Sequence, residues 1–175
     1  MVFKELYRLD MMRYGGHPDK YIKKFHYFFR KCQLCNIRVL NYGYRWIFQK
    51  IKEKRGLEIS YRTKIGKGLY LGHAYNITIN ASVVIGEYCN IHKGVTLGQD
   101  NRGSRKGTPV IGNKVWIGVN ATEVGNVKIG DDVLIAPNSF VNCDVPSHSI
   151  VFGNPCVIKH KDDATKGYIN CFDET

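Results

Sequence analysis

The sequence predicts a parallel β-helix preceded by a short helical region, so a mainly β protein. Between residues 57 and 141 aliphatic side chains recur every six positions, and glycine or alanine directly follows most of them. One inward aliphatic in each period of six fits short strands joined by tight corners, with three strands to a coil of 18 residues. Stacked coils of this kind bury one continuous axial core.

The first 55 of the 175 residues differ in composition from the rest of the chain. They hold 14 Lys and Arg against 4 Asp and Glu, a net charge of +10 out of +11 for the whole chain, and 12 of the 21 aromatic residues. Within 19–54, apolar residues at helical spacing predict two helices, with a start at Asp19 and a break near Asn41 and Gly43.

The basic region is open to two interpretations. Its aromatic face packs on the rest of the molecule, which we favour, or residues 19–54 attach the protein to an anionic membrane surface. Nucleic-acid binding is not expected, because no recognised binding motif accompanies the charge. The sequence has neither an apolar run long enough to span a bilayer nor a secretory leader. We therefore expect a cytoplasmic protein, or one peripheral on the inner face of the membrane.

The six cysteines follow no disulfide framework, so we expect reduced thiols. Cys32 and Cys35 form a lone C-x-x-C, which lacks the second pair of a four-ligand zinc site. Their place in an aromatic, helix-patterned segment favours a packing role.

The six-residue period has three irregularities. Leu71 and Ile79 are eight residues apart, and His73 lies in the gap, so we expect a corner that moves this histidine out of the regular stack. Residues 99–108 carry no aliphatic and predict a loop. Glu123 occupies an inward position, where a lone carboxylate is costly to bury. Either the register slips so that Val124 points inward instead, which we favour, or the carboxylate has a partner.

Residues 56–158 resemble the hexapeptide-repeat acyltransferases, whose β-helix is left-handed. The matching stretches are "EISYRTKIGKGLYLGHA", "VVIGEYCNIHKGVTLG", "PVIGNKVWIGVNA", "VKIGDDVLIAPNSFV" and "DVPSHSIVFGNPCVIK". They are most similar to serine acetyltransferase and to its sugar- and polysaccharide-acetylating relatives. Residues 1–55 then form a helical N-terminal region and 159–175 a C-terminal tail.

The resemblance implies a catalytic pair. It makes His73 the general base and Glu58, 15 positions earlier, the acidic residue that orients it, where the family usually has Asp. An imidazole near its ordinary pKa can take the proton of an acceptor hydroxyl, and a carboxylate stabilises the imidazolium that forms. The activated hydroxyl then attacks the thioester of acetyl-CoA.

The resemblance also implies a homotrimer with active sites at its interfaces, a loop at 99–108 that reaches the adjacent subunit, and no metal. The coenzyme arm would lie between two β-helices, beside small residues at the corners and with lysines facing its phosphates. The residues expected to bind acetyl-CoA are Gly98, Gly118, Ala136, Lys159 and Lys161.

The acceptor is the least constrained part of this prediction. Serine acetyltransferases carry an Arg-His pair just before the proline that ends the loop, where this chain has Gly107 and Thr108. They also carry an acidic residue just before the catalytic histidine, where this chain has Gly72. These departures favour a hydroxyl of a sugar or surface polysaccharide precursor as the acceptor, with serine as the alternative.

Two other classes are weighed against this prediction. A zinc carbonic anhydrase of the same fold would need three convergent histidines, and no third histidine joins His73 and His92 within the repeat before His148. A non-catalytic β-helix scaffold would have no reason to keep His73 together with Glu58.

Overall fold

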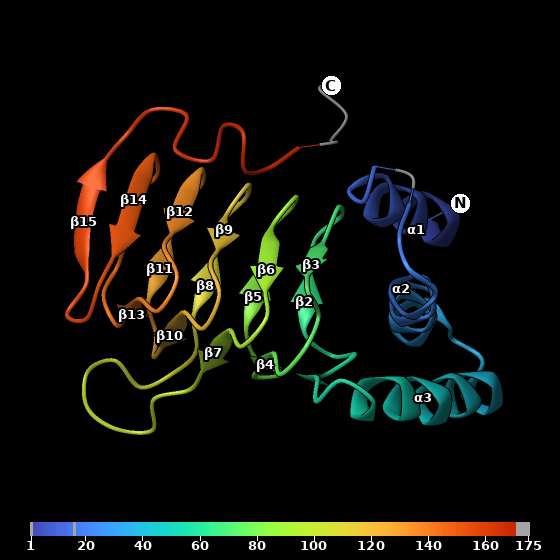
Figure 1. Cartoon of the computed structure of the whole chain (residues 1–175). Coiled ribbons are helices and arrows are strands. Elements are labelled where there is room, and N and C mark those ends of the chain that lie inside the picture. Colours follow the sequence, from blue (N-terminus) through green and yellow to red (C-terminus); the bar gives the residue numbers. More distant parts are fainter. Residues whose placement is uncertain (1, 16, 171–175) are drawn as a thin grey trace.

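The computed structural model describes residues 2–15 and 17–170, and within these ranges three helices precede fifteen short strands (Figure 1). The helices are α1 (Val2–Met12), α2 (Lys20–Leu34) and α3 (Arg38–Glu53). The strands wind into a left-handed parallel β-helix of about five turns, which confirms the fold class predicted from the repeat.

The strands stack into three sheets that form the sides of the triangular coil. Sheet A contains β1 (Glu58–Ile59), β4 (Thr78–Ile79), β7 (Thr96–Gly98), β10 (Thr122–Val124) and β13 (Phe140–Val141). Sheet B contains β2 (Lys64–Ile65), β5 (Val84–Ile85), β8 (Val110–Ile111) and β11 (Lys128–Ile129). Sheet C contains β3 (Tyr70–Gly72), β6 (Asn90–His92), β9 (Trp116–Ile117), β12 (Val133–Ile135), β14 (Ser149–Phe152) and β15 (Val157–His160).

Irregular spacing in the sequence is absorbed at the corners between strands. Ile79 pairs with Leu97, 18 residues further on, as a regular coil requires. Ile59 pairs with Ile79, 20 residues further on, and the two extra residues lie between β3 and β4. Leu97 pairs with Glu123, 26 residues further on, because the loop leaves the coil between β7 and β8. The inward residues therefore stay in line along the whole axis.

The register does not slip at Glu123, so our prediction for this residue is wrong. Glu123 is 0% exposed and stacks between Leu97 and Val141, whereas Val124 is only half-buried. Pairing on both sides fixes the register, because a one-residue slip would turn every side chain of β10 to the opposite face. Neither carboxyl oxygen of Glu123 has a partner among the described residues, and burial raises its pKa to about 8. The side chain is therefore mainly a neutral acid at pH 7.

Helices α1 and α2 are joined to the first coil by a buried ionic cluster. Asp10 accepts hydrogen bonds from Arg30 Nε at 2.8 Å, from His26 Nδ1 at 3.2 Å and from the Leu69 amide at 3.0 Å. Arg30 also donates to the Gly66 carbonyl at 2.6 Å. Burial raises the pKa of Asp10, but the bonds from His26 and Arg30 outweigh it and hold the pKa below its ordinary value. These partners offset the cost of burying the charges.

The break between the second and third helices lies at residues 35–37, not near Asn41 and Gly43 as the sequence predicts. Asn41 lies inside α3, and its Nδ2 donates to the carbonyls of Cys32 and Cys35 at 2.9 and 3.0 Å. A residue that looks like a helix breaker thus closes the end of the preceding helix. Cys32 itself packs in the core.

The C-terminal segment turns back across the outside of sheet C. Strand β15 is antiparallel to β14, and residues 161–170 then run towards the helices (Figure 1). Asp132 accepts hydrogen bonds from the amide and the hydroxyl of Thr165, at 3.0 and 2.7 Å. Further along, the ring of Tyr168 meets that of Trp116 edge to face, with centroids 5.2 Å apart.

Arg13, just after α1, connects this segment to the β-helix. Its guanidinium donates to the Asn170 carbonyl at 2.8 Å, to the Gly68 carbonyl at 2.7 Å and to Asn90 Oδ1 at 2.7 Å. The N-terminal helices, the first two coils and the C-terminal segment therefore meet at one side chain.

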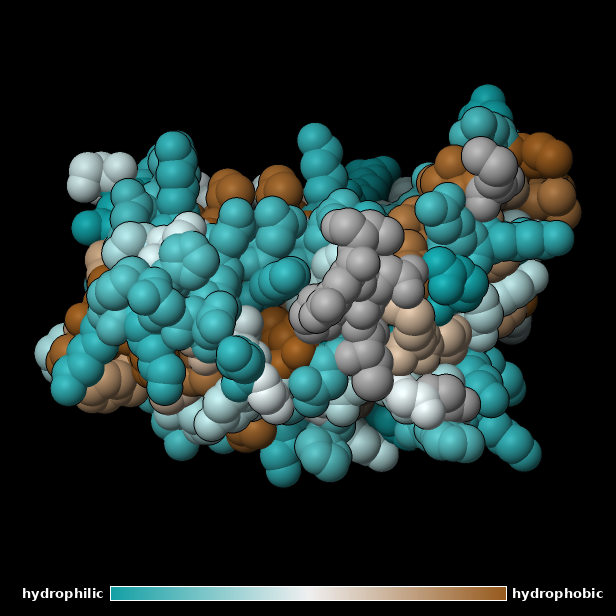
Figure 2. All heavy atoms as spheres, turned by 90° about the horizontal axis from the view of Figure 1, so that it is seen from above, coloured by the Kyte–Doolittle hydropathy of each residue, from teal (hydrophilic) through white to brown (hydrophobic). Residues whose placement is uncertain are grey.

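Helix α3 leaves apolar surface exposed. Val39, Tyr42 and Trp46 are 83%, 73% and 63% exposed. Figure 2 shows hydrophobic side chains at the surface at the end of the molecule that carries the helices. Within the described residues, no helix has both the length and the apolar character needed to cross a bilayer.

Candidate functional site

The eight-residue interval in the repeat forms an irregular corner between β3 and β4, and His73 is its first residue. His73 is exposed and has a φ of 50°, a left-handed conformation that is uncommon outside glycine. The corner is held by the Asn76 amide, which donates to the Arg55 carbonyl at 2.8 Å. The Arg55 guanidinium also lies 4.8 Å from the centre of the Tyr75 ring. The corner thus presents an imidazole to the outside of the β-helix.

Glu58, the predicted partner of His73, lies on β1 with its side chain exposed on the outer face of sheet A. Within the described part of the chain, no hydrogen bond or ion pair joins Glu58 to His73. Catalytic hydrogen bonds are often long or poorly aligned in the absence of substrate. The catalytic pair therefore stays a prediction.

A second histidine, His92, lies beside the same corner and explains why residue 72 is a glycine. Gly72 pairs with His92 in the next coil, and any β-carbon at position 72 would overlap the imidazole. The ring of His92 packs on Trp116, with centroids 4.7 Å apart. Burial, and then the charge of His73, lower the pKa of His92 to about 4. His92 is therefore a neutral imidazole at pH 7, and its Nε2 is buried without a partner among the described residues.

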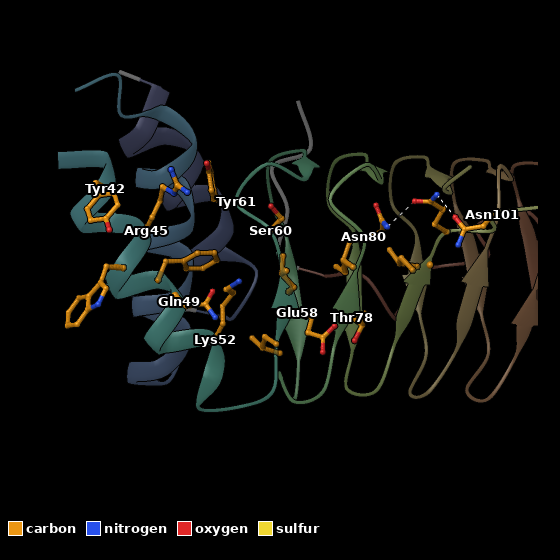
Figure 3. Close-up of a pocket in the computed structure, with 18 residues that line it drawn as sticks. Tyr42, Arg45, Gln49, Lys52, Glu58, Ser60, Tyr61, Thr78, Asn80 and Asn101 are labelled. Carbon is orange, nitrogen blue, oxygen red and sulfur yellow. Dashed lines mark hydrogen bonds between the residues drawn. The ribbon is translucent and has the colours of Figure 1, made fainter. Parts of the chain in front are cut away.

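A pocket of about 990 Å³ opens between α3 and the outer face of sheet A (Figure 3). Figure 3 shows that α3 and strands β1 and β4 supply facing walls. The polar and charged side chains that line it are Tyr42, Arg45, Gln49, Lys52, Glu58, Ser60, Tyr61, Thr78, Asn80, Gln99 and Asn101. Glu58 thus belongs both to this pocket and to the predicted catalytic pair.

The charges of this pocket are two cations on one wall and a carboxylate on the other. The Arg45 guanidinium lies 4.8 Å from the centre of the Tyr61 ring. Partial burial lowers the pKa of Lys52, while nearby acidic groups, Glu58 among them, act in the opposite direction. The pocket therefore carries a net positive charge and suits an anionic or zwitterionic ligand.

The residues expected to bind acetyl-CoA fall into three places. Gly118 and Ala136 lie next to each other at the carboxyl ends of β9 and β12 in sheet C, since they directly follow the paired residues of these strands. Gly98 ends β7 in sheet A and lines the pocket beside α3. Lys159 and Lys161 are exposed in and just after β15. A single chain does not gather these residues into one site.

Gly118 also has a structural reason to be glycine. A β-carbon there would lie 2.6 Å from the Pro137 nitrogen, so the close stacking of coils already requires its absence. Glycine at this corner is therefore weak support for a coenzyme site.

The loop between β7 and β8 contains a short antiparallel closure. Asp100 and Gly107 exchange two backbone hydrogen bonds, both of 3.0 Å. Gly107 and Thr108, at its end, offer no charged side chain to an acceptor.

The remaining titratable groups that the structure describes do not gather into a metal site. In residues 2–15 and 17–170, no three or more His, Cys, Asp or Glu side chains gather where an ion could bind. Cys143 and Cys156 are free thiols with their sulfur atoms 3.7 Å apart, a proximity that the sequence does not indicate.

The β-helix is similar to known acetyltransferases. Residues 108–143 match the family described as "Bacterial transferase hexapeptide (six repeats)". The chain is 38% identical over 100 residues to a serine acetyltransferase of Synechococcus elongatus, covering 57% of this chain and 41% of that protein. It is 36% identical over 107 residues to a serine acetyltransferase of Helicobacter pylori, covering 61% of this chain and 63% of that protein.

A solved structure extends the similarity into the helical region. The Neisseria gonorrhoeae serine acetyltransferase in complex with serine superposes with a TM-score of 0.70 and 28% identity, covering 90% of this chain and 69% of that one. The chain is thus similar to serine acetyltransferases in its hexapeptide repeats, in sequence and in fold. It spans less than two thirds of the length of the curated relatives that it matches.

These comparisons correct our prediction of a sugar acceptor. The relatives of this hexapeptide-repeat domain are serine acetyltransferases, which supports the alternative and not polysaccharide acetylation. A sugar was expected because Gly72, Gly107 and Thr108 carry no charged side chains. Missing groups at these positions do not exclude an amino acid, because other side chains can bind its charges.

Proposed function

We propose that the protein is an acetyl-CoA-dependent serine O-acetyltransferase. The proposal is carried by the similarity of its β-helix to serine acetyltransferases, together with the exposed imidazole of His73 at the corner that gains two residues. A hydroxyl is a poor nucleophile until a base removes its proton, and an exposed imidazole can do this near neutral pH.

In the proposed reaction His73 takes the proton of the serine hydroxyl while the oxygen attacks the thioester carbonyl of acetyl-CoA. The carbon–sulfur bond then breaks, coenzyme A leaves, and the proton passes from His73 to its sulfur. Glu58 orients the imidazole and stabilises its protonated form. Because no hydrogen bond joins the two side chains in one chain, we place their contact in the assembled, substrate-bound enzyme.

The proposed donor site combines the groups predicted from the sequence. The coenzyme arm passes the compact corner of Gly118 and Ala136, and the phosphates meet Lys159 and Lys161. Gly98 lies near the acceptor side, because it lines the pocket that contains Glu58. These groups are separated within one chain, which supports a homotrimer in which neighbouring copies complete each site.

We also propose that the basic N-terminal region holds the enzyme at an anionic membrane surface. Residues 1–55 carry a net charge of +10, and α3 exposes Val39 and Trp46 beside its basic residues. Apolar side chains among cations are what peripheral attachment to acidic lipid requires.

The test of the activity is release of coenzyme A thiol from acetyl-CoA in the presence of L-serine, with O-acetylserine identified by mass spectrometry. We expect serine-dependent turnover of at least about 1 s⁻¹, typical of enzymes. The His73→Ala variant provides the background rate. Folded protein that releases no thiol with serine above this background would contradict the proposed function.

A further inference from the structure

The pocket beside α3 contains two cations that the proposed reaction has not yet used. Arg45 and Lys52 are about two turns apart on α3, and Gln49 lies between them on the same face. Among the described residues neither cation forms an ion pair, whereas the neighbouring Lys50 pairs with Glu53 at 3.1 Å. Helix α3 therefore directs two positive charges that form no ion pair towards a pocket.

A serine acceptor brings a carboxylate that needs such a partner. The loop ends in Gly107 and Thr108, and the corner before His73 is Gly72, so none of these positions supplies a charge. Arg45 and Lys52 supply positive charge on the wall of the pocket that faces Glu58. We propose that Arg45 and Lys52 of α3 bind the carboxylate of the acceptor amino acid. This inference rests on the proposed function and names the residues that select its substrate.

Each of the two cations lies over an aromatic ring. The Arg45 guanidinium lies 4.8 Å from the centre of the Tyr61 ring, and Lys52 Nζ lies 5.3 Å from the centre of the Phe48 ring. Phe48 is itself buried, so the ring beneath the Lys52 ammonium belongs to the core. Planar guanidinium and partly desolvated ammonium groups pair well with a carboxylate, because less ordering and less water removal remain to be done.

The opposite wall gives the acceptor a direction. Glu58 lies across the pocket from Lys52 in Figure 3, and it is the residue proposed to act with His73. With its carboxylate on α3, the acceptor turns its ammonium and hydroxyl ends towards Glu58. The charge pattern of the pocket is thus that of a zwitterion, negative towards α3 and positive towards β1.

The experiment compares L-serine with L-serinamide, which keeps the hydroxyl and the ammonium group but has a neutral amide in place of the carboxylate. Steady-state KM and kcat are measured for both acceptors with wild type, Arg45→Gln, Lys52→Gln and the double variant. Lys50→Gln is the matched control, because it removes the same charge from the same helix outside the pocket. Lys52→Arg keeps the charge and guards against a packing effect at this half-buried position.

We expect each Gln substitution in the pocket to raise the KM for serine about 10- to 100-fold. This is the change expected when a hydrogen bond to a charged group is lost. The KM for serinamide should change less than threefold, and Lys50→Gln should stay close to wild type. Lys52→Arg should recover part of the affinity for serine that Lys52→Gln loses. The kcat should not change. A rise in KM at constant kcat indicates an interaction that is equally strong in the ground state and in the transition state.

Two contrary results have different meanings. If wild type acetylates neither serine nor serinamide, the proposed function is wrong and the inference falls with it. If wild type acetylates serine but the pocket variants behave like Lys50→Gln, or lose both acceptors equally, then α3 does not bind the carboxylate while the proposed function stands.

Discussion

The buried carboxyl group of Glu123 should make the stability of the β-helix fall as the pH rises. Its pKa is about 8 in the folded chain, because burial without a partner disfavours the charged form, against 4.5 for a free glutamate. Between these values the unfolded chain releases a proton that the folded chain retains. The contribution is therefore fully present below pH 4.5 and is lost as the pH rises towards 8.

The size of the effect follows from the difference in pKa. A gap of about 3.5 pKa units corresponds to a loss on the order of 5 kcal/mol in the free energy of unfolding, and most of it has occurred by pH 7. This is a large part of the stability of a typical domain. Glu123→Gln removes the titration but keeps shape and polarity. Glu123→Leu also restores the aliphatic that Leu97 provides one coil earlier.

The assay is urea unfolding followed by circular dichroism at pH 5, 7 and 9, with wild type and both variants at one fixed protein concentration. Other titrating groups are shared, so the difference between wild type and Glu123→Gln isolates this carboxyl. We expect that difference to change by several kcal/mol between pH 5 and 9, and Glu123→Leu to be the most stable at pH 9. Parallel pH curves for wild type and Glu123→Gln would refute the reasoning.

Three further outcomes are expected. His73→Ala should leave the protein folded and lower the rate of acetyl transfer about 10²–10⁴-fold. Glu58→Gln should lower the rate less, because the base remains. An undiminished rate in His73→Ala would remove His73 from the mechanism. Gly72→Ala should cost about 1–3 kcal/mol of stability, because the new methyl overlaps the ring of His92, and almost nothing in a His92→Ala background; additive costs in the double-mutant cycle would contradict this contact. The protein should co-sediment with acidic liposomes at low salt, and less of it should do so at high salt or with Trp46→Ala. Neutral liposomes should not retain it. Absence of binding at low salt would mean that the N-terminal region serves packing alone.

The β-helix could be predicted because its signal is local and repeated. Each hexad carries its own aliphatic and its own small corner residue, so errors at one position do not spread to the next. The gap between Leu71 and Ile79 could be located for the same reason, and it places His73 at an irregular corner. What happens at such a corner depends on neighbours that the repeat does not describe, such as the ring of His92 over Gly72.

The pocket and the fate of Glu123 could not be predicted, because both depend on contacts made by the folded chain. Arg45 and Glu58 come together only after α3 docks beside β1, and Arg45 looked like one more charge in a basic helix. Glu123 stays inward because the strands on both sides fix the register, a constraint that outweighs the cost of burying the group. The acceptor was mispredicted for a related reason. The absence of charge at Gly72, Gly107 and Thr108 does not reveal whether side chains of α3 can bind an amino acid instead.

The C-terminal segment changes how a stack of coils can come apart. Coils that touch only their neighbours fray from either end, one after another. Here Thr165 is bound to Asp132 in the fourth coil, Tyr168 accepts from Asn90 in the second, and Asn170 accepts from Arg13, which also holds the first. One short segment thus bonds to three different coils, so separating these coils also breaks its bonds. We therefore expect them to unfold together rather than one after another.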